Sequence, residues 1–196
     1  ITIIEIMKEI DFLKKYFKEI ESLVSPDIKN IKKLLFAKKI IINTKKSKNK
    51  ILIFGNGGSA AIASHFSVDL TKNAKVRCVN FNEADLITCF SNDYGYEKWI
   101  EKAIKYYGNK NDVLILISSS GESKNVINGC KMAKKMKFKK IITFSGNSKK
   151  NNLSKLGDLN FWVDSKAYNH VENVHQIWLL SLVDLIIGKS KYLTNL

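Results

Sequence analysis

The chain has 196 residues and a formal net charge of +15, from 33 Lys and Arg against 18 Asp and Glu. Hydrophobic residues make up 45% of it, which is typical of a globular protein and excludes an intrinsically disordered chain. No apolar run approaches the roughly 20 residues that span a bilayer, and no signal peptide opens the sequence, so we expect no membrane segment. The cysteines Cys78, Cys89 and Cys130 form neither a disulfide framework nor a CxxC zinc pair, which favours a cytoplasmic location.

The strong positive charge raises the question of nucleic-acid binding, because basic surfaces gain affinity by releasing counterions from phosphates. Arg77 is the only arginine, although arginine is the preferred side chain for bidentate phosphate and guanine contacts. The lysines are also spread along the whole chain among Ile and Asn. A solvated lysine surface therefore explains the charge better than a nucleic-acid interface.

The N-terminal quarter predicts two amphipathic helices. Apolar residues recur at helical spacing between Ile4 and Ile20 and again between Ile31 and Ile41. The only proline, Pro26, follows Ser25, and this pair predicts a helix start with Ser25 as the N-cap. We expect a helical hairpin over residues 1–48, whose apolar faces are buried against the rest of the chain or against another subunit.

Residues 49–196 predict an α/β core in a single domain spanning 1–196. Short apolar runs without strict alternation are typical of strands that are buried on both faces of a parallel sheet. The predicted strands are Ile51–Phe54, Val76–Asn80, Val113–Ser118, Lys140–Phe144 and Asn160–Val163. The predicted helices are Ala60–Leu70, Tyr96–Tyr107, Ser123–Met136 and Val171–Ile187. This alternation predicts a doubly wound, three-layer αβα sandwich with a five-stranded parallel sheet of the flavodoxin type.

Two junctions between a predicted strand and a predicted helix are rich in glycine and serine. The first reads Gly55-Asn-Gly-Gly-Ser59 and the second reads Ser118-Ser-Ser-Gly-Glu-Ser123. Free backbone N–H groups and the positive end of a helix dipole lie at such junctions and attract phosphate. Neither loop has the spacing of a dinucleotide fingerprint or a P-loop. Either loop alone would pass as an ordinary turn, but two loops on one sheet edge favour a phosphorylated small molecule.

Three further groups of polar residues have functional and structural interpretations. His65 and Asp69 are four residues apart on a predicted helix, which gives either a site or an exposed polar face. Glu172, His175 and Gln176 share a face of the last helix, where His175 could equally be a buried structural histidine. A polar turn, Asn92-Asp93-Tyr94-Gly95, is unremarkable in isolation.

Taken together, these residues resemble the sugar-isomerase (SIS) domain family, and within it the phosphoheptose isomerases. The resemblance rests on four stretches in the family's order and covers essentially the whole chain: residues 55–66, 91–96, 117–123 and 171–175. It implies an enzyme that interconverts sedoheptulose 7-phosphate and a heptopyranose 7-phosphate, D-glycero-D-manno-heptose 7-phosphate, for lipopolysaccharide or capsule precursors. It also implies a homotetramer built by the N-terminal helices.

The resemblance assigns roles to individual residues. Ser118, Ser119, Ser120 and Ser123 would hold the sugar phosphate. The rest of the substrate site would be lined by Asn56, Gly57, Gly58, Ser59, Asn92, Asp93 and Glu172. The catalytic residues would be Asp69, Glu172 and Asp93. Where the family binds zinc, the ligands here would be His65, Asp69 and Glu172.

The sequence departs from the family at three of these positions. Asp69 replaces a glutamate that serves as base and metal ligand, and Glu172 replaces a glutamine that touches substrate and metal. Leu180 replaces a histidine used as acid and metal ligand, and leucine neither transfers a proton nor binds a metal. The retained loops favour an isomerase with a remodelled site. The loss at Leu180 favours the alternative, a phosphosugar-binding or regulatory protein without catalysis.

Overall fold

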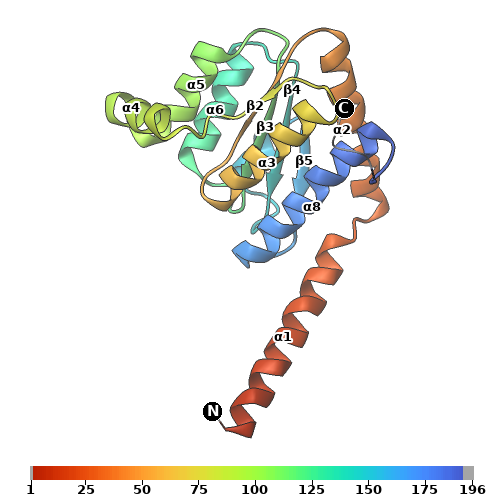
Figure 1. The fold of residues 1–196 in the computed structure, drawn as a ribbon. Helices are drawn as coiled ribbons and strands as arrows, with labels where there is room; N and C mark the ends of the chain where they lie inside the picture. Colours follow the sequence, from red (N-terminus) through yellow and green to blue (C-terminus); the bar gives the residue numbers. More distant parts are fainter. Residues whose placement is uncertain (1, 192–196) are drawn as a thin grey trace.

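The computed structural model describes residues 2–191, and their fold is shown in Figure 1. The strands are β1 (Ile51–Phe54), β2 (Cys78–Val79), β3 (Val113–Ser118), β4 (Lys140–Ser145) and β5 (Leu159–Trp162). The helices are α1 (Ile3–Val24), α2 (Ile28–Lys46), α3 (Gly58–Lys72), α4 (Ala84–Tyr94), α5 (Trp99–Tyr107), α6 (Lys124–Lys135), α7 (Asn152–Leu156) and α8 (Tyr168–Ile187), with a 3-10 turn at Tyr96–Lys98. No helix within the described residues is long and apolar enough to span a membrane.

The five strands form one parallel sheet in the order β2-β1-β3-β4-β5, which confirms the predicted fold class. Every residue of β1 and of β3 is buried, because helices cover both faces of the sheet. This double burial explains why the two strands are continuous apolar runs. The carboxyl ends of the neighbouring strands β1 and β3 therefore bring the two glycine- and serine-containing loops side by side.

The sheet divides the hydrophobic core into two layers. One layer contains the apolar faces of α2, α3 and α8, around Phe66, Phe161 and Trp178. The other contains those of α5, α6 and α7, around Trp99 and Phe54. The helices that carry the candidate site residues 58–69 and 172–176, α3 and α8, consequently lie on the same face of the sheet.

The N-terminal helices are present, but their junction differs from the prediction. Ser25 is the C-cap of α1, and Asp27 is the N-cap of α2, where its side chain accepts a hydrogen bond from Asn30 N at 2.7 Å. Aspartate is as good an N-cap as serine, and its place one residue after Pro26 moves the helix start. Helix α2 packs on the body, whereas α1 projects away from it (Figure 1) instead of folding back along α2.

Several other boundaries also differ. Only Cys78–Val79 of the predicted strand 76–80 pairs with β1, at the sheet edge. The predicted helix 96–107 begins with a 3-10 turn and becomes α-helical at Trp99. Helix α4, which the sequence analysis missed, ends in the Asn92-Asp93-Tyr94 stretch that was predicted as a turn. Helix α7, of five residues, was also missed.

Candidate functional site

The first loop, between β1 and α3, depends on two glycines for its shape. Gly57 has φ +54°, in the region that favours glycine, and is the N-cap of α3. A Cβ on Gly55 would lie 2.7 Å from the Cβ of Ser59, so the chain turns too tightly there for any larger residue. Ser59 is buried in the first turn of α3. The loop thus brings the N-terminus of α3 close to the end of the strand.

The second loop, between β3 and α6, is held by its own serines. The hydroxyls of Ser118 and Ser123 lie 3.1 Å apart, and Gly121 N donates to Ser118 Oγ at 3.2 Å. Ser123 is the N-cap of α6, yet its hydroxyl makes no capping bond to the backbone. Val126 N donates to Asn125 Oδ1 at 3.0 Å, so the first turn of α6 keeps its first two N–H groups for an anion. The half-buried Ser120 and Ser123 add hydroxyl donors.

Glu172, from the first turns of α8, joins the two loops. Its Oε1 accepts a hydrogen bond from Ser119 Oγ at 3.3 Å. On its other side the carboxyl group lies against Gly58, so closely that a Cβ there would stand 2.7 Å from Glu172 Cδ. A carboxylate thus lies between the two glycine- and serine-containing loops.

Asn56 is held by two residues that the sequence analysis did not single out. Its amide pairs reciprocally with that of Asn125, at 3.0 and 2.8 Å, and its Oδ1 also accepts from the Tyr96 hydroxyl at 3.1 Å. Asn125 is buried in the first turn of α6, so this pair ties the first loop to the helix that follows the second. In the sequence, only its position two residues after Ser123 could have indicated that Asn125 lies at the site.

His65 and Asp69 are paired on α3, as their spacing predicted. Asp69 Oδ2 lies 3.3 Å from His65 Nε2, and Asp69 Oδ1 accepts from Asn73 Nδ2 at 3.3 Å. His65 Nδ1 lies 3.5 Å from Nε2 of Gln176, which was not assigned to the site. Gln176 is one turn beyond Glu172, and this spacing had placed it on the same face of the helix without giving it a role.

The geometry on these two helices does not form the expected metal site. Among residues 2–191, no three His, Cys, Asp or Glu side chains stand close enough together to hold a metal ion. Glu172 is engaged with Ser119 and Gly58, away from the His65–Asp69 pair. Zinc sites use three or four such ligands, so His65, Asp69 and Glu172 do not fit zinc as they are arranged. Leu180, half-buried on α8, adds no ligand.

His175 has the structural role that was one of its two interpretations. It is fully buried, its Nε2 lies 3.2 Å from the Ser145 carbonyl oxygen, and its ring packs edge-on against Phe144. Burial lowers the pKa of His175 to about 4, partly opposed by the hydrogen bond to Ser145. The imidazole is therefore neutral at pH 7 and lies in the core between α8 and the sheet.

Asn92 and Asp93 form no hydrogen bond with either loop within residues 2–191. Both are exposed at the end of α4, where Asp93 accepts from Asn92 Nδ2 at 3.0 Å and contacts Cys89 Sγ at 3.8 Å. Their predicted contact with substrate, and the catalytic role of Asp93, stay predictions. Tyr96, two residues after this segment, does reach the first loop through Asn56.

Comparison with known proteins identifies the family of the chain. The SIS domain model matches residues 15–146. A phosphoheptose isomerase of Aliarcobacter butzleri is 35% identical, over 76% of this chain and 82% of the relative. One from Helicobacter pylori is 31% identical, over 90% and 94%. The solved structure of a phosphoheptose isomerase from Francisella tularensis matches the fold with a TM-score of 0.80 at 24% identity, over 92% of this chain and 98% of that one. The chain therefore belongs to the SIS-domain family, in the branch that contains the phosphoheptose isomerases.

Proposed function

We propose that the protein is an aldose–ketose isomerase of the phosphoheptose type. It interconverts D-sedoheptulose 7-phosphate and D-glycero-D-manno-heptose 7-phosphate, and so supplies heptose for lipopolysaccharide or capsule. The observation that carries the proposal is the Glu172 carboxylate between two anion-binding loops, 3.3 Å from Ser119 Oγ. The relatives named phosphoheptose isomerase support the same reaction class.

The second loop is the proposed phosphate site. Ser118, Ser119, Ser120 and Ser123 supply hydroxyl groups, and the start of α6 supplies backbone N–H groups. These donors are neutral, so the phosphate keeps its charge while the loop fixes its position. Asn56, Gly57, Gly58 and Ser59 of the first loop then face the sugar chain, held in place by Asn125.

The chemistry requires a proton to move between neighbouring carbons. In the ketose-to-aldose direction, a base takes a proton from C1, the C–H electron pair forms the C1–C2 double bond, and the C2 carbonyl oxygen takes up a proton, which gives an enediol. The base then returns its proton to C2, while the O1 hydroxyl loses its proton and C1 becomes the aldehyde carbonyl. We assign this transfer to Glu172. Asp69 is eleven residues beyond Gly58 on α3, about 16 Å along the helix axis, and it is already paired with His65.

No step of this reaction is routed through zinc, because the three expected ligands are not brought together. Metal analysis of the purified protein tests whether zinc is bound in solution. Asp93 is the third proposed catalytic residue and lies three residues before Tyr96, which reaches Asn56 of the first loop.

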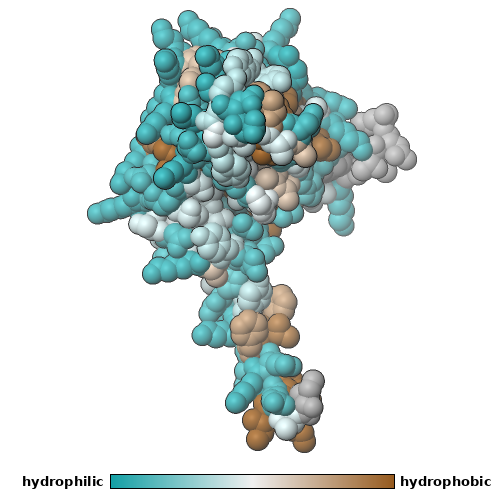
Figure 2. Space-filling view, turned by 90° about the vertical axis from the view of Figure 1, so that its left-hand side faces the viewer, coloured by the Kyte–Doolittle hydropathy of each residue, from teal (hydrophilic) through white to brown (hydrophobic). Residues whose placement is uncertain are grey.

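The assembly we propose is a homotetramer in the cytoplasm, with α1 in the subunit contacts. Helix α1 has no buried residue within the described chain, and Figure 2 shows apolar side chains along its projecting part. Its exposed large apolar residues are Ile3, Ile4, Ile6, Met7, Ile10, Phe12, Leu13 and Phe17. A stripe of this length is costly in water and is typical of a subunit interface.

A second candidate function is a SIS-domain protein that binds a phosphosugar without converting it and acts on a protein partner. Leu180 favours it, because no acid stands at that position, and so does the absence of a three-ligand group among residues 2–191. In this case the Ser118–Ser123 loop would keep its affinity while turnover is lost.

The deciding experiment is incubation with sedoheptulose 7-phosphate, with and without zinc, followed by NMR of the sugar isomers. Conversion that is abolished by Glu172→Gln and retained in part by Asp69→Asn supports the isomerase and the assignment of the base. Binding without conversion in either condition establishes the second candidate. If the protein neither binds nor converts the sugar phosphate, both candidate functions are refuted.

A further inference from the structure

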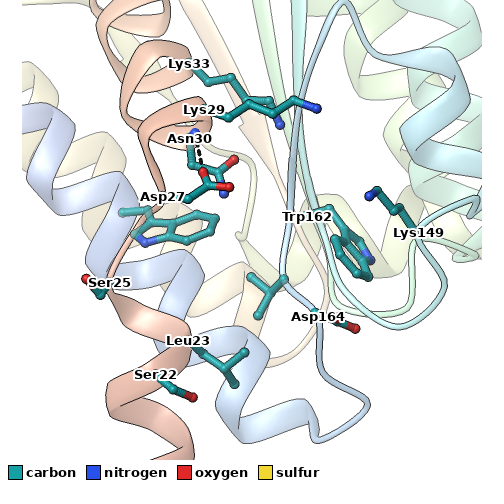
Figure 3. A pocket seen from close by; sticks show the side chains of 12 residues that line it. Ser22, Leu23, Ser25, Asp27, Lys29, Asn30, Lys33, Lys149, Trp162 and Asp164 are labelled. Atoms are coloured by element: carbon teal, nitrogen blue, oxygen red, sulfur yellow. Dashed lines mark hydrogen bonds between the residues drawn. The ribbon is translucent and has the colours of Figure 1, made fainter.

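A cavity lies away from the two loops, where α1 meets α2. It has a volume of about 290 Å³ and is lined by residues from the α1–α2 junction, the β4–α7 loop and the β5–α8 loop. Figure 3 shows Trp162 in its wall, with Lys29 and Lys33 extending from α2 on one side and Lys149 on the other. None of the residues proposed for the isomerase site lines it.

The cavity gathers positive charge that the protein does not neutralise. No ion pair among residues 2–191 involves Lys29, Lys33 or Lys149. Lys33 Nζ donates to the Asn160 carbonyl oxygen at 2.7 Å, which holds the ammonium group in place without cancelling its charge. The pKa of Lys33 is lowered by burial, and further by repulsion from Lys29 and from Lys149, while Asp27 acts in the opposite direction.

The two carboxylates in the wall form no ion pair with these lysines within residues 2–191, although Asp27 attracts Lys33. Asp27 accepts the capping bond from Asn30 N, at the start of α2. Asp164 is exposed and lies beyond Trp162 from Lys29 and Lys33 (Figure 3). Lys149 Nζ stands 5.5 Å from the centroid of the Trp162 ring, so the third ammonium group is held at the aromatic wall.

We propose that this cavity is a second binding site, for a phosphorylated small molecule. The phosphate lies between Lys29, Lys33 and Lys149, and the carbon part of the ligand packs on the indole rings of Trp162 and Trp178. Such a ligand relieves the repulsion among the three ammonium groups, which an uncharged ligand would not do. Because Trp178 Nε1 donates to the Val24 carbonyl oxygen at 2.9 Å, the ligand also stabilises the base of α1 on the body.

The test uses inorganic pyrophosphate as the probe, with binding measured by isothermal titration calorimetry at low ionic strength. The double variant Lys29→Met/Lys149→Met removes two exposed lysines of the cavity and is expected to weaken binding at least tenfold. The control Lys131→Met/Lys134→Met removes two exposed lysines of α6 with the same change in net charge, and is expected to keep wild-type affinity. Trp162, the least buried of the three tryptophans, should report binding through its fluorescence.

A further variant separates this cavity from the Ser118–Ser123 loop. Ser120→Leu obstructs the loop and should weaken sugar-phosphate binding there, while a pyrophosphate site that depends on Lys29 and Lys149 persists. The proposal is refuted if wild type shows no pyrophosphate binding at millimolar concentration. It is equally refuted if Lys29→Met/Lys149→Met binds within twofold of the control, or if Ser120→Leu abolishes all pyrophosphate binding.

Discussion

Replacing Gly58 with alanine isolates the position of the Glu172 carboxyl group from the stability of the fold. Gly58 is the first residue of α3 and its φ is not in the left-handed region, so alanine adopts the same backbone. Alanine favours a helix over glycine by about 1 kcal/mol at interior positions, and by less at a first position. We therefore expect the melting temperature of Gly58→Ala to equal or slightly exceed that of wild type.

The catalytic cost follows from the space beside Gly58. The new Cβ would stand 2.7 Å from Glu172 Cδ and 3.0 Å from Oε1, whereas carbon atoms in ordinary contact stand about 3.5–4.0 Å apart. The end of the Glu172 side chain is flexible and moves aside by about 1 Å, away from its place between the loops. A misplacement of this size can cost about a hundredfold in rate, or about 2.7 kcal/mol of transition-state stabilisation.

The assay is the isomerisation rate followed by NMR, beside a thermal unfolding curve of each variant. Glu172→Asp shortens the carboxylate by one methylene and makes room for the added methyl group. The double variant Gly58→Ala/Glu172→Asp should therefore lose less activity than the product of the two single losses. The reasoning fails if Gly58→Ala retains the wild-type kcat/KM, or if its activity falls only in proportion to lost folded protein.

Four other predictions follow from particular contacts. His175 has a pKa of about 4 in the folded protein against an ordinary value of 6.5. Its contribution of about 3 kcal/mol to the free energy of unfolding is therefore present above pH 6.5 and is lost as the pH falls toward 4. Urea unfolding at several pH values should show this loss, and His175→Asn should flatten the pH dependence. Asn125→Ala removes both bonds to the Asn56 amide and should lower the free energy of unfolding by about 1–3 kcal/mol in the same measurement. Leu180→His should raise the zinc content of the purified protein, measured by mass spectrometry. An unchanged zinc content would contradict the inference that residue 180 of α8 lies opposite Asp69 of α3. Leu13→Glu on α1 should shift sedimentation from tetramer to smaller species, whereas a wild-type monomer would refute the assembly.

The sequence predicted those parts of the fold that depend on burial alone. The bounds of β1 and β3 are as predicted, because both strands are enclosed and their apolar runs end where the loops begin. Val76–Asn80 includes Arg77 and Asn80, it lies at the sheet edge, and only two of its residues pair with β1. Helix α4 was missed because its last turn contains Asn92 and Asp93, which are equally typical of a turn.

The candidate site was predicted in its loops but not in its ligand geometry. Glycine and serine positions after β1 and β3 follow from local sequence, since the sheet edge alone brings them together. To predict whether His65, Asp69 and Glu172 come together, one must know the direction in which each side chain points from its helix. Glu172 reaches toward Gly58 and Ser119, and spacing along α8 carries no information about that choice.

The contacts between α3 and α8 bear on which of the proposed catalytic carboxylates, Asp69 or Glu172, takes the proton. The helices meet first at Gly58 and Glu172, next to the phosphate loops, and then at His65 and Gln176. One turn further along both helices, Asp69 comes opposite Leu180 by its spacing. A carboxylate facing a leucine has no partner across the groove with which to share a proton, whereas Glu172 has the Ser119 hydroxyl. These contacts favour Glu172 over Asp69 as the base in the isomerisation that we propose.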